Sequence, residues 1–281
     1  MPLLAALVLE LCQEDAVRNL IEQLSSDKIE ARAEAYRKLE AIGRPALALL
    51  EKASQDSDGE VASRARTLLV RIPIRERLTP ALLSGVDGIY DRLALGDWMP
   101  VFLDLAAELR QPPERRRHPG LRAEDLAFMA PLAVDAARSE ADRVAVCQAV
   151  GRLQLKTSIP NVVAMLKDER FLVRSNALGA IRDADARDQA GVVRPLLADP
   201  HPLVRSVAAH TLGKFGDQEA VPGLRKLLSD ENPNVRWWAV QAIGDLKAPD
   251  VAQDLRRLQD DPNEAVRRIA ADTLRQLRQK P

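Results

Sequence analysis

Cysteine is nearly absent from this chain of 281 residues, which has only Cys12 and Cys147. The two lie far apart and in no spacing typical of metal ligands, so the sequence indicates no disulfide framework and favours a reducing compartment. Aromatic residues make up only 3% of the chain and β-branched runs are scarce, whereas Ala, Leu, Arg, Glu and Gln abound. That composition predicts an all-α protein.

Excess charge of either sign is also lacking, because 41 basic residues balance 41 acidic ones. A net charge of zero argues against a protein whose main task is to coat nucleic acid or an anionic membrane. It leaves room for a local basic patch. With 46% hydrophobic and 29% charged residues, the chain has the composition of a soluble, folded protein.

The first dozen residues, MPLLAALVLELC, are apolar, but they are too short to span a bilayer. They lack the charged start and the clear cleavage site of a secretory signal. We expect residues 1–15 to form an apolar N-terminal helix that caps the fold, in a cytoplasmic protein. The alternative is a remnant of an export signal, with an exported protein if residues 1–12 belong to one.

A repeat of 31 residues organises the C-terminal half. Within each unit an Asp stands five residues before a Val-Arg pair, an Ala four residues after the Val, and Ile or Leu eight residues after it. One period earlier, Asp142-Arg143 continues the same frame, which gives five consecutive units over residues 137–281. The four complete Val-Arg pairs are Val173-Arg174, Val204-Arg205, Val235-Arg236 and Val266-Arg267.

Each unit is expected to form two helices, as residues 219–246 illustrate. Apolar residues recur at helical spacing over 219–228, and again from Val235 to Leu246. Between them, Asn232 is a plausible N-cap and Pro233 a first-turn residue. Neither helix can bury its apolar stripe alone, so the pairs must stack. We predict an all-α, right-handed α-solenoid of stacked antiparallel helix pairs.

The motif Asp-x-x-x-x-Val-Arg-x-x-Ala-x-x-x-(Leu/Ile)-Gly resembles the short HEAT repeats of the phycobilisome-lyase type, most fully at 199–228. The resemblance covers residues 137–281 strongly. It extends weakly to 16–72, where we expect two N-terminal HEAT-like repeats. The resemblance also implies that the recurring Asp and Arg form a ladder between neighbouring repeats rather than an active site.

Residues 73–136 break the pattern with seven prolines, and we interpret them as a divergent helical connector. Helices are expected near 80–94, 98–110 and 122–138. The basic loop 111–122 between the last two holds Arg115, Arg116 and Arg117, a candidate anion-binding site. Its alternative is a solvated insertion whose charge is partly offset by Glu108 and Glu114.

No motif for catalysis, metal or cofactor is present. The three histidines, His118, His201 and His210, stand in no ligand spacing, and there is neither a phosphate-binding loop nor a nucleophile elbow. We therefore expect a protein that is not an enzyme and that binds no cofactor and no metal.

The adjacent pair Trp237-Trp238 stands out in a chain with three tryptophans. At about 100° per residue, Trp237 points about 165° away from the apolar stripe of its helix and Trp238 about 95° away. Trp237 is thus the better candidate for contact with a partner, whereas Trp238 could also pack between repeats. The same positions in neighbouring units define a predicted partner-binding strip: Ser175, Asn176, Ser206, Val207, His210, Trp237, Trp238 and Gln241.

The leading hypothesis is a non-enzymatic HEAT-repeat scaffold that binds a protein or peptide on its concave face. The alternatives are a nucleic-acid-binding protein similar to the HEAT-type DNA glycosylases, or a phycobilin lyase or chaperone. Nucleic acid is the weaker partner because the inner positions carry mixed charge. The oligomeric state and the identity of the partner are left open.

Overall fold

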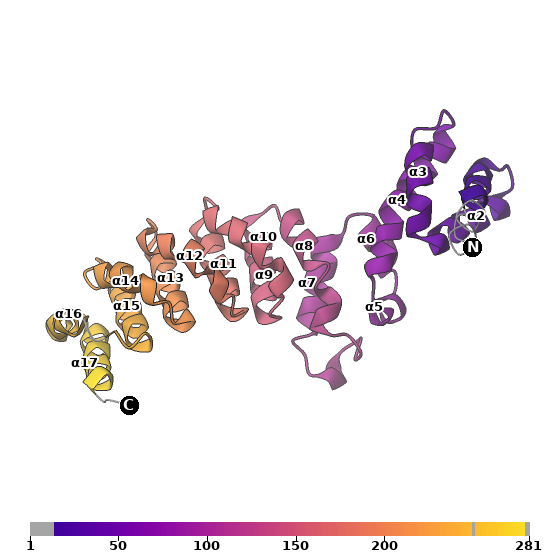
Figure 1. Ribbon diagram of the computed structural model, residues 1–281. Coiled ribbons are helices and arrows are strands. Elements are labelled where there is room, and N and C mark those ends of the chain that lie inside the picture. Colours follow the sequence, from indigo (N-terminus) through magenta and orange to yellow (C-terminus); the bar gives the residue numbers. More distant parts are fainter. Residues whose placement is uncertain (1–13, 249–250, 279–281) are drawn as a thin grey trace, which may run out of the picture. The chain divides into compact units, whose positions relative to one another are not determined.

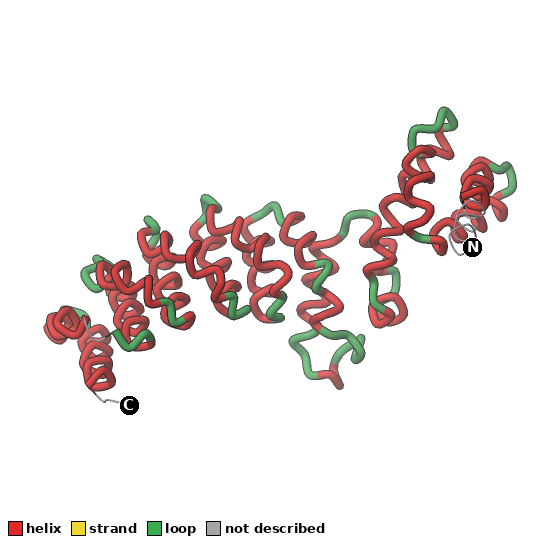
Figure 2. Tube along the Cα trace, viewed as in Figure 1, coloured by secondary structure: helices red, strands yellow, loops and turns green. Residues whose placement is uncertain are grey.

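The computed structural model describes residues 14–248 and 251–278, and within them every regular element is a helix (Figure 2). The all-α fold class is confirmed. The apolar segment 1–13 lies outside the described residues, and residues 14–22 are helical. The chain divides into two compact units, Met1–Asp97 and Trp98–Pro281, here called the N-terminal and C-terminal units. The division falls inside the predicted connector 73–136.

The N-terminal unit is built from short helices and one long one. Asp58 caps the long helix by accepting hydrogen bonds from the amides of Glu60 and Val61. This helix continues through Pro73, so it crosses the boundary expected between residues 72 and 73. After residues 14–22 the elements are η1 (Gln23–Ser25), α2 (Ile29–Ile42), η2 (Arg44–Ala46), α3 (Leu47–Ala53), α4 (Gly59–Arg77), α5 (Pro80–Gly85) and α6 (Ile89–Ala94).

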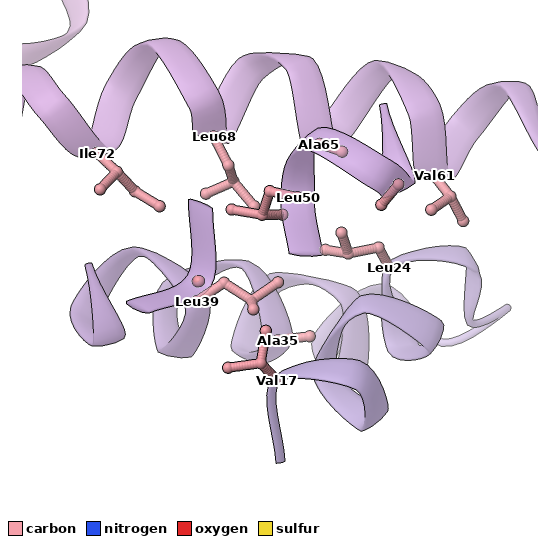
Figure 3. Packing of buried hydrophobic residues seen from close by; sticks show 11 residues of the cluster. Val17, Leu24, Ala35, Leu39, Leu50, Val61, Ala65, Leu68 and Ile72 are labelled. Atoms are coloured by element: carbon pink, nitrogen blue, oxygen red, sulfur yellow. The ribbon is translucent and has the colours of Figure 1, made fainter. Parts of the chain in front are cut away.

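The core of the N-terminal unit is a single hydrophobic cluster between α2, α3 and α4 (Figure 3). Leu39 of α2, Leu50 of α3 and Leu68 of α4 are fully buried in it. Ala35 and Ala65 are also fully buried, and their small side chains let the helices approach closely. The frame that predicted helical pairs over 16–72 thus corresponds to helices with a shared apolar core.

The buried carboxylate of Glu40 links three helices of the N-terminal unit, α2, α4 and α6. Glu40 of α2 accepts hydrogen bonds from Arg71 at 2.9 Å and Arg75 at 3.0 Å, both on α4, and from the hydroxyl of Tyr90 on α6. The guanidinium of Arg71 also lies 4.1 Å from the centre of the Tyr90 ring and pairs with Asp91 at 2.7 Å. Since every charge in this group has a partner, it holds α2, α4 and α6 together without an uncompensated buried charge.

The C-terminal unit begins with the rest of the connector and continues through the five repeats. Its elements are α7 (Trp98–Glu108), η3 (Pro113–Arg115), η4 (Ala123–Leu126), α8 (Ala130–Ala136), α9 (Glu140–Arg152), η5 (Lys156–Ser158), α10 (Ile159–Ala164), η6 (Met165–Lys167), α11 (Phe171–Asp183), η7 (Arg187–Gln189), α12 (Ala190–Val193), η8 (Arg194–Ala198), α13 (Pro202–Phe215), η9 (Gln218–Ala220), α14 (Val221–Leu227), α15 (Pro233–Asp245), α16 (Ala252–Arg257), η11 (Leu258–Asp260) and α17 (Glu264–Arg278).

The second helices of the repeats pack on one another in chain order. Figure 1 shows α9, α11, α13, α15 and α17 side by side, and α7 packs against α9 at the start of the row. We call this row, α7 to α17, the second-helix layer. The first helices α10, α12, α14 and α16 pack against it. Asn232 caps α15 by accepting a hydrogen bond from the Asn234 amide, and Pro233 occupies the first turn, as predicted.

The predicted ladder of Asp and Arg joins each repeat to the next. Arg174 donates to both carboxylate oxygens of Asp199 at 2.8 Å, and the pairs Arg205–Asp230 and Arg236–Asp261 repeat this geometry. Arg143–Asp168 adds a further rung. Each Asp also accepts the backbone amide two residues on, which is the N-cap residue in the case of His201 and Asn232. The aspartates therefore orient the cap residues and are not the caps themselves.

The pKa values of three carboxyl groups in the ladder, Asp168, Asp230 and Asp261, are lowered. For Asp168, hydrogen bonds from Arg170 hold the pKa well below its usual range. For Asp230 and Asp261, desolvation is the largest effect and would raise the pKa. The hydrogen bonds and charges of the ladder arginines, together with hydrogen bonds from the backbone amides of Asn232 and Asn263, outweigh it, so the net shift is downward. The folded protein therefore holds these groups charged at lower pH than the unfolded chain does.

Stability should fall steeply in acid for this reason. Because the folded pKa values lie below the unfolded value of about 3.9, the contribution of the ladder is complete above that pH and is lost as the pH falls through the folded pKa values. We expect urea midpoints to drop sharply below about pH 4. The Asp261→Asn variant, which cannot ionise, should show a shallower slope. An unchanged slope in that variant would contradict this origin of the acid sensitivity.

The second helices also share a way of ending. A residue one or two positions after the helix end has a positive φ at the same place of the 31-residue frame in four successive repeats: Gln154 (53°), Asp185 (50°), Gly216 (72°) and Lys247 (51°). Only one of the four is glycine, although the left-handed conformation is costly for other residues. The recurrence shows that repeat packing imposes this turn whatever the local residue.

Candidate functional site

The predicted partner-binding strip lies on three neighbouring helices of the second-helix layer. Ser175 and Asn176 are on α11, Ser206, Val207 and His210 on α13, and Trp237, Trp238 and Gln241 on α15. The structure therefore places all eight residues on one row of helices within the C-terminal unit. Six of them are half-buried.

Ser175 and Ser206 are largely buried, because only 6% and 4% of them is exposed. Little of either side chain is therefore available for contact with a partner. The prediction from the spacing of about 100° per residue assumed that the apolar stripe is the only buried side of each second helix. Within the layer, however, a second helix also packs against the second helices beside it. Gly213, about 20° from Ser206 around α13, faces Ala242 of α15. Ser206 accordingly faces a neighbouring helix rather than solvent.

An aromatic cluster bridges α13 and α15. The imidazole of His210 stacks on the indole of Trp238, with ring centres 4.1 Å apart and planes 22° from parallel. Trp237 meets Trp238 edge to face at 4.7 Å and 85°. Arg182 of α11 approaches the other side of the group, with a guanidinium nitrogen 3.3 Å from Nδ1 of His210. Trp238 thus packs between repeats, and Trp237 contacts it from the same helix.

His210 is uncharged at neutral pH. Desolvation lowers its pKa most, and the positive charges of Arg182 and Lys214 lower it further, to about 4. If Nδ1 accepts from Arg182, then Nε2 carries the proton and is a hydrogen-bond donor. The cluster therefore presents two indole rings and a neutral imidazole, a combination suited to burying apolar surface beside a few hydrogen bonds.

Charged groups near the aromatic cluster are mutually paired. Arg182 also contacts Asp183 at 2.9 Å, and Lys214 contacts Asp245 at 3.2 Å. Gln241 donates to the same Asp245 at 3.0 Å. This part of the second-helix layer is therefore polar without a net surplus of either sign.

An open depression of about 370 Å³ lies beside the cluster, over α9, α11 and α13. Asn176, Gly179 and Val207 line it, together with the small exposed part of Ser175. Gln148 of α9 donates to Asn176 at 3.0 Å and borders the depression on the opposite side. The remaining lining residues include Arg152, Arg182, Asp183 and Leu203.

A narrower slot lies between α7 and α9, at the start of the second-helix layer. Its volume is about 180 Å³. The sequence analysis missed it because the connector does not follow the repeat frame, although the spacing 103, 106, 107 and 110 marks one face of a helix. The slot is lined by Leu103, Ala106, Ala107, Arg110, Ala145, Gln148, Ala149, Arg152 and Leu153.

Two of the three arginines in the basic loop 111–122 make hydrogen bonds or ion pairs within the chain. Arg116 donates to the backbone carbonyls of Gln111 at 2.8 Å and Leu109 at 3.1 Å. Arg117 pairs with Asp104 at 3.0 Å and with Glu108 at 3.2 Å. Arg115 is exposed, and it is the one arginine of the three that has no side-chain partner among the described residues. Two of the three arginines are thus engaged within the chain, which argues against an anion site formed by all three.

His118 closes this loop on α7. Its Nδ1 lies 2.8 Å from the buried carboxylate of Glu108, and its backbone amide donates to the same group at 2.6 Å. Burial would raise the pKa of Glu108, but the hydrogen bonds from His118 outweigh burial and the pKa is lowered. The histidine therefore has a structural partner in the loop.

Groups with chemical reactivity are not assembled in the described part of the chain. No three His, Cys, Asp or Glu side chains within residues 14–248 and 251–278 are placed to hold a metal ion. Cys147 is fully buried, its sulfur 3.4 Å from that of Met165, and desolvation raises the pKa of its thiol to about 12. Such a thiol is not a nucleophile at neutral pH. None of the described helices is both long and apolar enough to cross a membrane.

The fold defines a helical-repeat protein made of stacked antiparallel helix pairs. Residues 190–275 match the family model for HEAT repeats, in agreement with the HEAT-repeat resemblance drawn from the motif. No curated protein sequence matches the chain.

Several solved structures are similar at low identity. The complex of CpcE and CpcF of phycocyanin lyase from Nostoc sp. PCC7120 has a TM-score of 0.49 and 23% identity over 61% of this chain and 70% of that one. An engineered protein has a TM-score of 0.47 and 16% identity over 93% of this chain and 78% of its own. Human deoxyhypusine hydroxylase in complex with glycerol has a TM-score of 0.38 and 21% identity over 98% of each chain.

Proposed function

We propose that this protein is a non-enzymatic scaffold that binds a protein or peptide partner on the second-helix layer. The observation that carries the proposal is the aromatic cluster of Trp237, Trp238 and His210. Two half-buried tryptophans stand side by side on α15, in a chain with few aromatic residues. Tryptophan is the residue type most enriched at the energetic centres of protein interfaces.

The proposed contact surface is narrower than the strip expected from the helical wheel. It comprises Asn176, Val207, His210, Trp237, Trp238 and Gln241, and it leaves out Ser175 and Ser206 because both are largely buried. Binding there would proceed by burial of aromatic surface and a few hydrogen bonds, without covalent chemistry. The paired charges around the cluster support a protein partner over nucleic acid, which needs a continuous positive surface.

A cytoplasmic location is part of the same proposal. It rests on the scarcity of cysteine and on the one described thiol, Cys147, being buried and unpaired.

Trp237→Ala should abolish most of the binding while leaving the fold intact. The tagged full-length chain and the variant would be used to capture partners from the source lysate, and the affinity of a recovered partner would then be measured by calorimetry. Loss of an interface tryptophan weakens binding roughly tenfold or more. Trp237→Phe should recover part of the affinity, because it restores an aromatic ring.

The matched control is Val192→Ala, which alters an apolar side chain that is 44% exposed on α12, outside the second-helix layer. It should bind like the unmodified chain, and circular dichroism should show equal helix content for all three variants. If Trp237→Ala bound the partner as tightly as Val192→Ala does, the proposed site would be wrong.

A further inference from the structure

The slot between α7 and α9 is built from matching stripes on two neighbouring helices. Leu103, Ala106 and Ala107 face Ala145 and Ala149 across it, and the alanines are what leave the space. At about 180 Å³ it is below the range of roughly 300–1,000 Å³ that is typical of small-molecule pockets. A single aliphatic side chain of a partner is an occupant of the right size and polarity.

Two arginines stand at one end of the slot. Arg110 follows the end of α7, and Arg152 is the last residue of α9. Both are exposed, and neither has an ion-pair partner among residues 14–248 and 251–278. The nearby carboxylates already have ion-pair partners, because Asp104 pairs with Arg117 and Asp183 pairs with Arg182. The slot therefore carries an uncompensated positive charge, unlike the surface around the tryptophans.

The position of Arg110 is supported by the loop. Arg116 donates to the carbonyl of Leu109, the residue directly before Arg110, at 3.1 Å. The contacts of the basic loop thus hold the backbone that carries Arg110. The arginine that matters for an anionic partner lies beside the loop rather than among Arg115, Arg116 and Arg117.

The slot and the depression beside the aromatic cluster are contiguous. Gln148 and Arg152 line both of them, and the depression continues over α11 to Val207 of α13. His210, one turn further along α13, stacks on Trp238 of α15. An extended segment of a partner could therefore contact the slot and the tryptophans at the same time.

We propose that the partner presents an acidic, extended segment to the second-helix layer, with one aliphatic side chain in the slot between α7 and α9 and neighbouring carboxylates paired with Arg110 and Arg152. The inference rests on the proposed function and adds the chemistry of the partner. Charge-assisted pairing with arginine would set the direction of the segment, and the slot would set its register.

The test uses three labelled peptides and the full-length chain. In the first peptide one leucine is flanked by glutamates, in the second the glutamates are lysines, and in the third the leucine is serine. Fluorescence anisotropy should show the glutamate–leucine peptide binding roughly tenfold more tightly than the lysine peptide, with an affinity that falls as salt is added. The serine peptide should bind several-fold more weakly than the first, because it leaves the slot empty.

Variants of the slot separate charge from shape. Arg110→Ala and Arg152→Ala should each weaken binding of the glutamate–leucine peptide roughly fivefold to tenfold, as expected for loss of a charge-assisted hydrogen bond. Ala145→Phe should fill the slot and abolish the preference for leucine over serine. Arg256→Ala is the matched control, because it removes an exposed arginine of α16, outside the second-helix layer. It should bind like the unmodified chain.

Two results would overturn the inference: no preference for the acidic peptide, or equal binding by the unmodified chain and the Arg110→Ala/Arg152→Ala double variant. The captured partner distinguishes this failure from failure of the proposed function. A partner lost by Trp237→Ala but retained by the double arginine variant would leave the scaffold function standing and refute the acidic segment. A partner retained by Trp237→Ala but lost by the double variant would move the site to the slot.

Discussion

Asp199→Ala is expected to lower the free energy of unfolding by about 3 kcal/mol or more. The carboxylate is nearly buried, with 6% of its side chain exposed, and it pairs with the Arg174 side chain, which is 11% exposed. Removal leaves the guanidinium without a counter-ion in a site that water reaches poorly. It also removes the acceptor for the backbone amide of His201, which begins α13.

The loss should also change the shape of the unfolding transition. In a repeat protein, stability is close to a sum of the repeats and the interfaces between neighbours. Asp199 follows the first helices of its repeat and holds Arg174 of the preceding repeat, so the variant weakens that one interface. Urea unfolding followed by circular dichroism should become broader, and hydrogen exchange should show the two sides of the interface opening separately.

Glu231→Ala is the control for Asp199→Ala. Glu231 lies 3.9 Å from a ladder arginine, Arg205, but 89% of its side chain is exposed. An exposed ion pair contributes little, so the change should stay within about 0.5 kcal/mol. Equal effects of the two substitutions would show that the ladder does not hold the repeats together.

Gly213→Val is expected to cost about 3 kcal/mol, for steric reasons. A Cβ at Gly213 of α13 would lie 2.8 Å from the Cα and 2.9 Å from the Cβ of Ala242 on α15. The obstacle is backbone rather than the end of a flexible side chain, so the two helices would have to move apart. Gly151 meets Ala180 in the same way two interfaces earlier in the stack, between α9 and α11.

The matched substitution Gly191→Val tests the same change where there is room. Gly191 lies on α12, and a Cβ there would meet no atom within 4 Å. Its stability should stay within about 0.5 kcal/mol of the unmodified chain, because valine is a slightly better helix former than glycine. Thermal unfolding of the two variants side by side measures the difference. Comparable losses at both sites would show that the close approach of α13 and α15 at Gly213 is not the cause.

Much of the architecture could be predicted from the sequence because the same pattern of cap, first-turn and apolar residues recurs in successive units. A single unit with Asn232, Pro233 and Val235 in order indicates where a helix begins and which side is apolar. Repetition at 31 residues then requires the units to stack. The ladder was expected from the resemblance to HEAT repeats, and the recurrence of Asp and Arg in successive units is the sequence pattern that carries it.

The candidate site was predicted only in part. The row of helices and the two tryptophans were foreseen, and so was the packing of Trp238 between repeats as one of its alternatives. The burial of Ser175 and Ser206 was not, because the wheel represents one helix and omits the helices beside it. The slot was missed altogether, since α7 lies in the connector, outside the repeat frame.

The spacing of apolar residues along the chain was enough to specify helices, their pairing and the 31-residue frame, because each depends on contacts within a unit or between identical units. The accessible surface depends instead on how closely neighbouring helices approach and on which arginines find carboxylates. Those are properties of residues distant in sequence, such as Gly213 with Ala242 or Arg117 with Asp104. For that reason the repeat could be recognised in the sequence, whereas the unpaired charges of Arg110 and Arg152 could be recognised only in the folded chain.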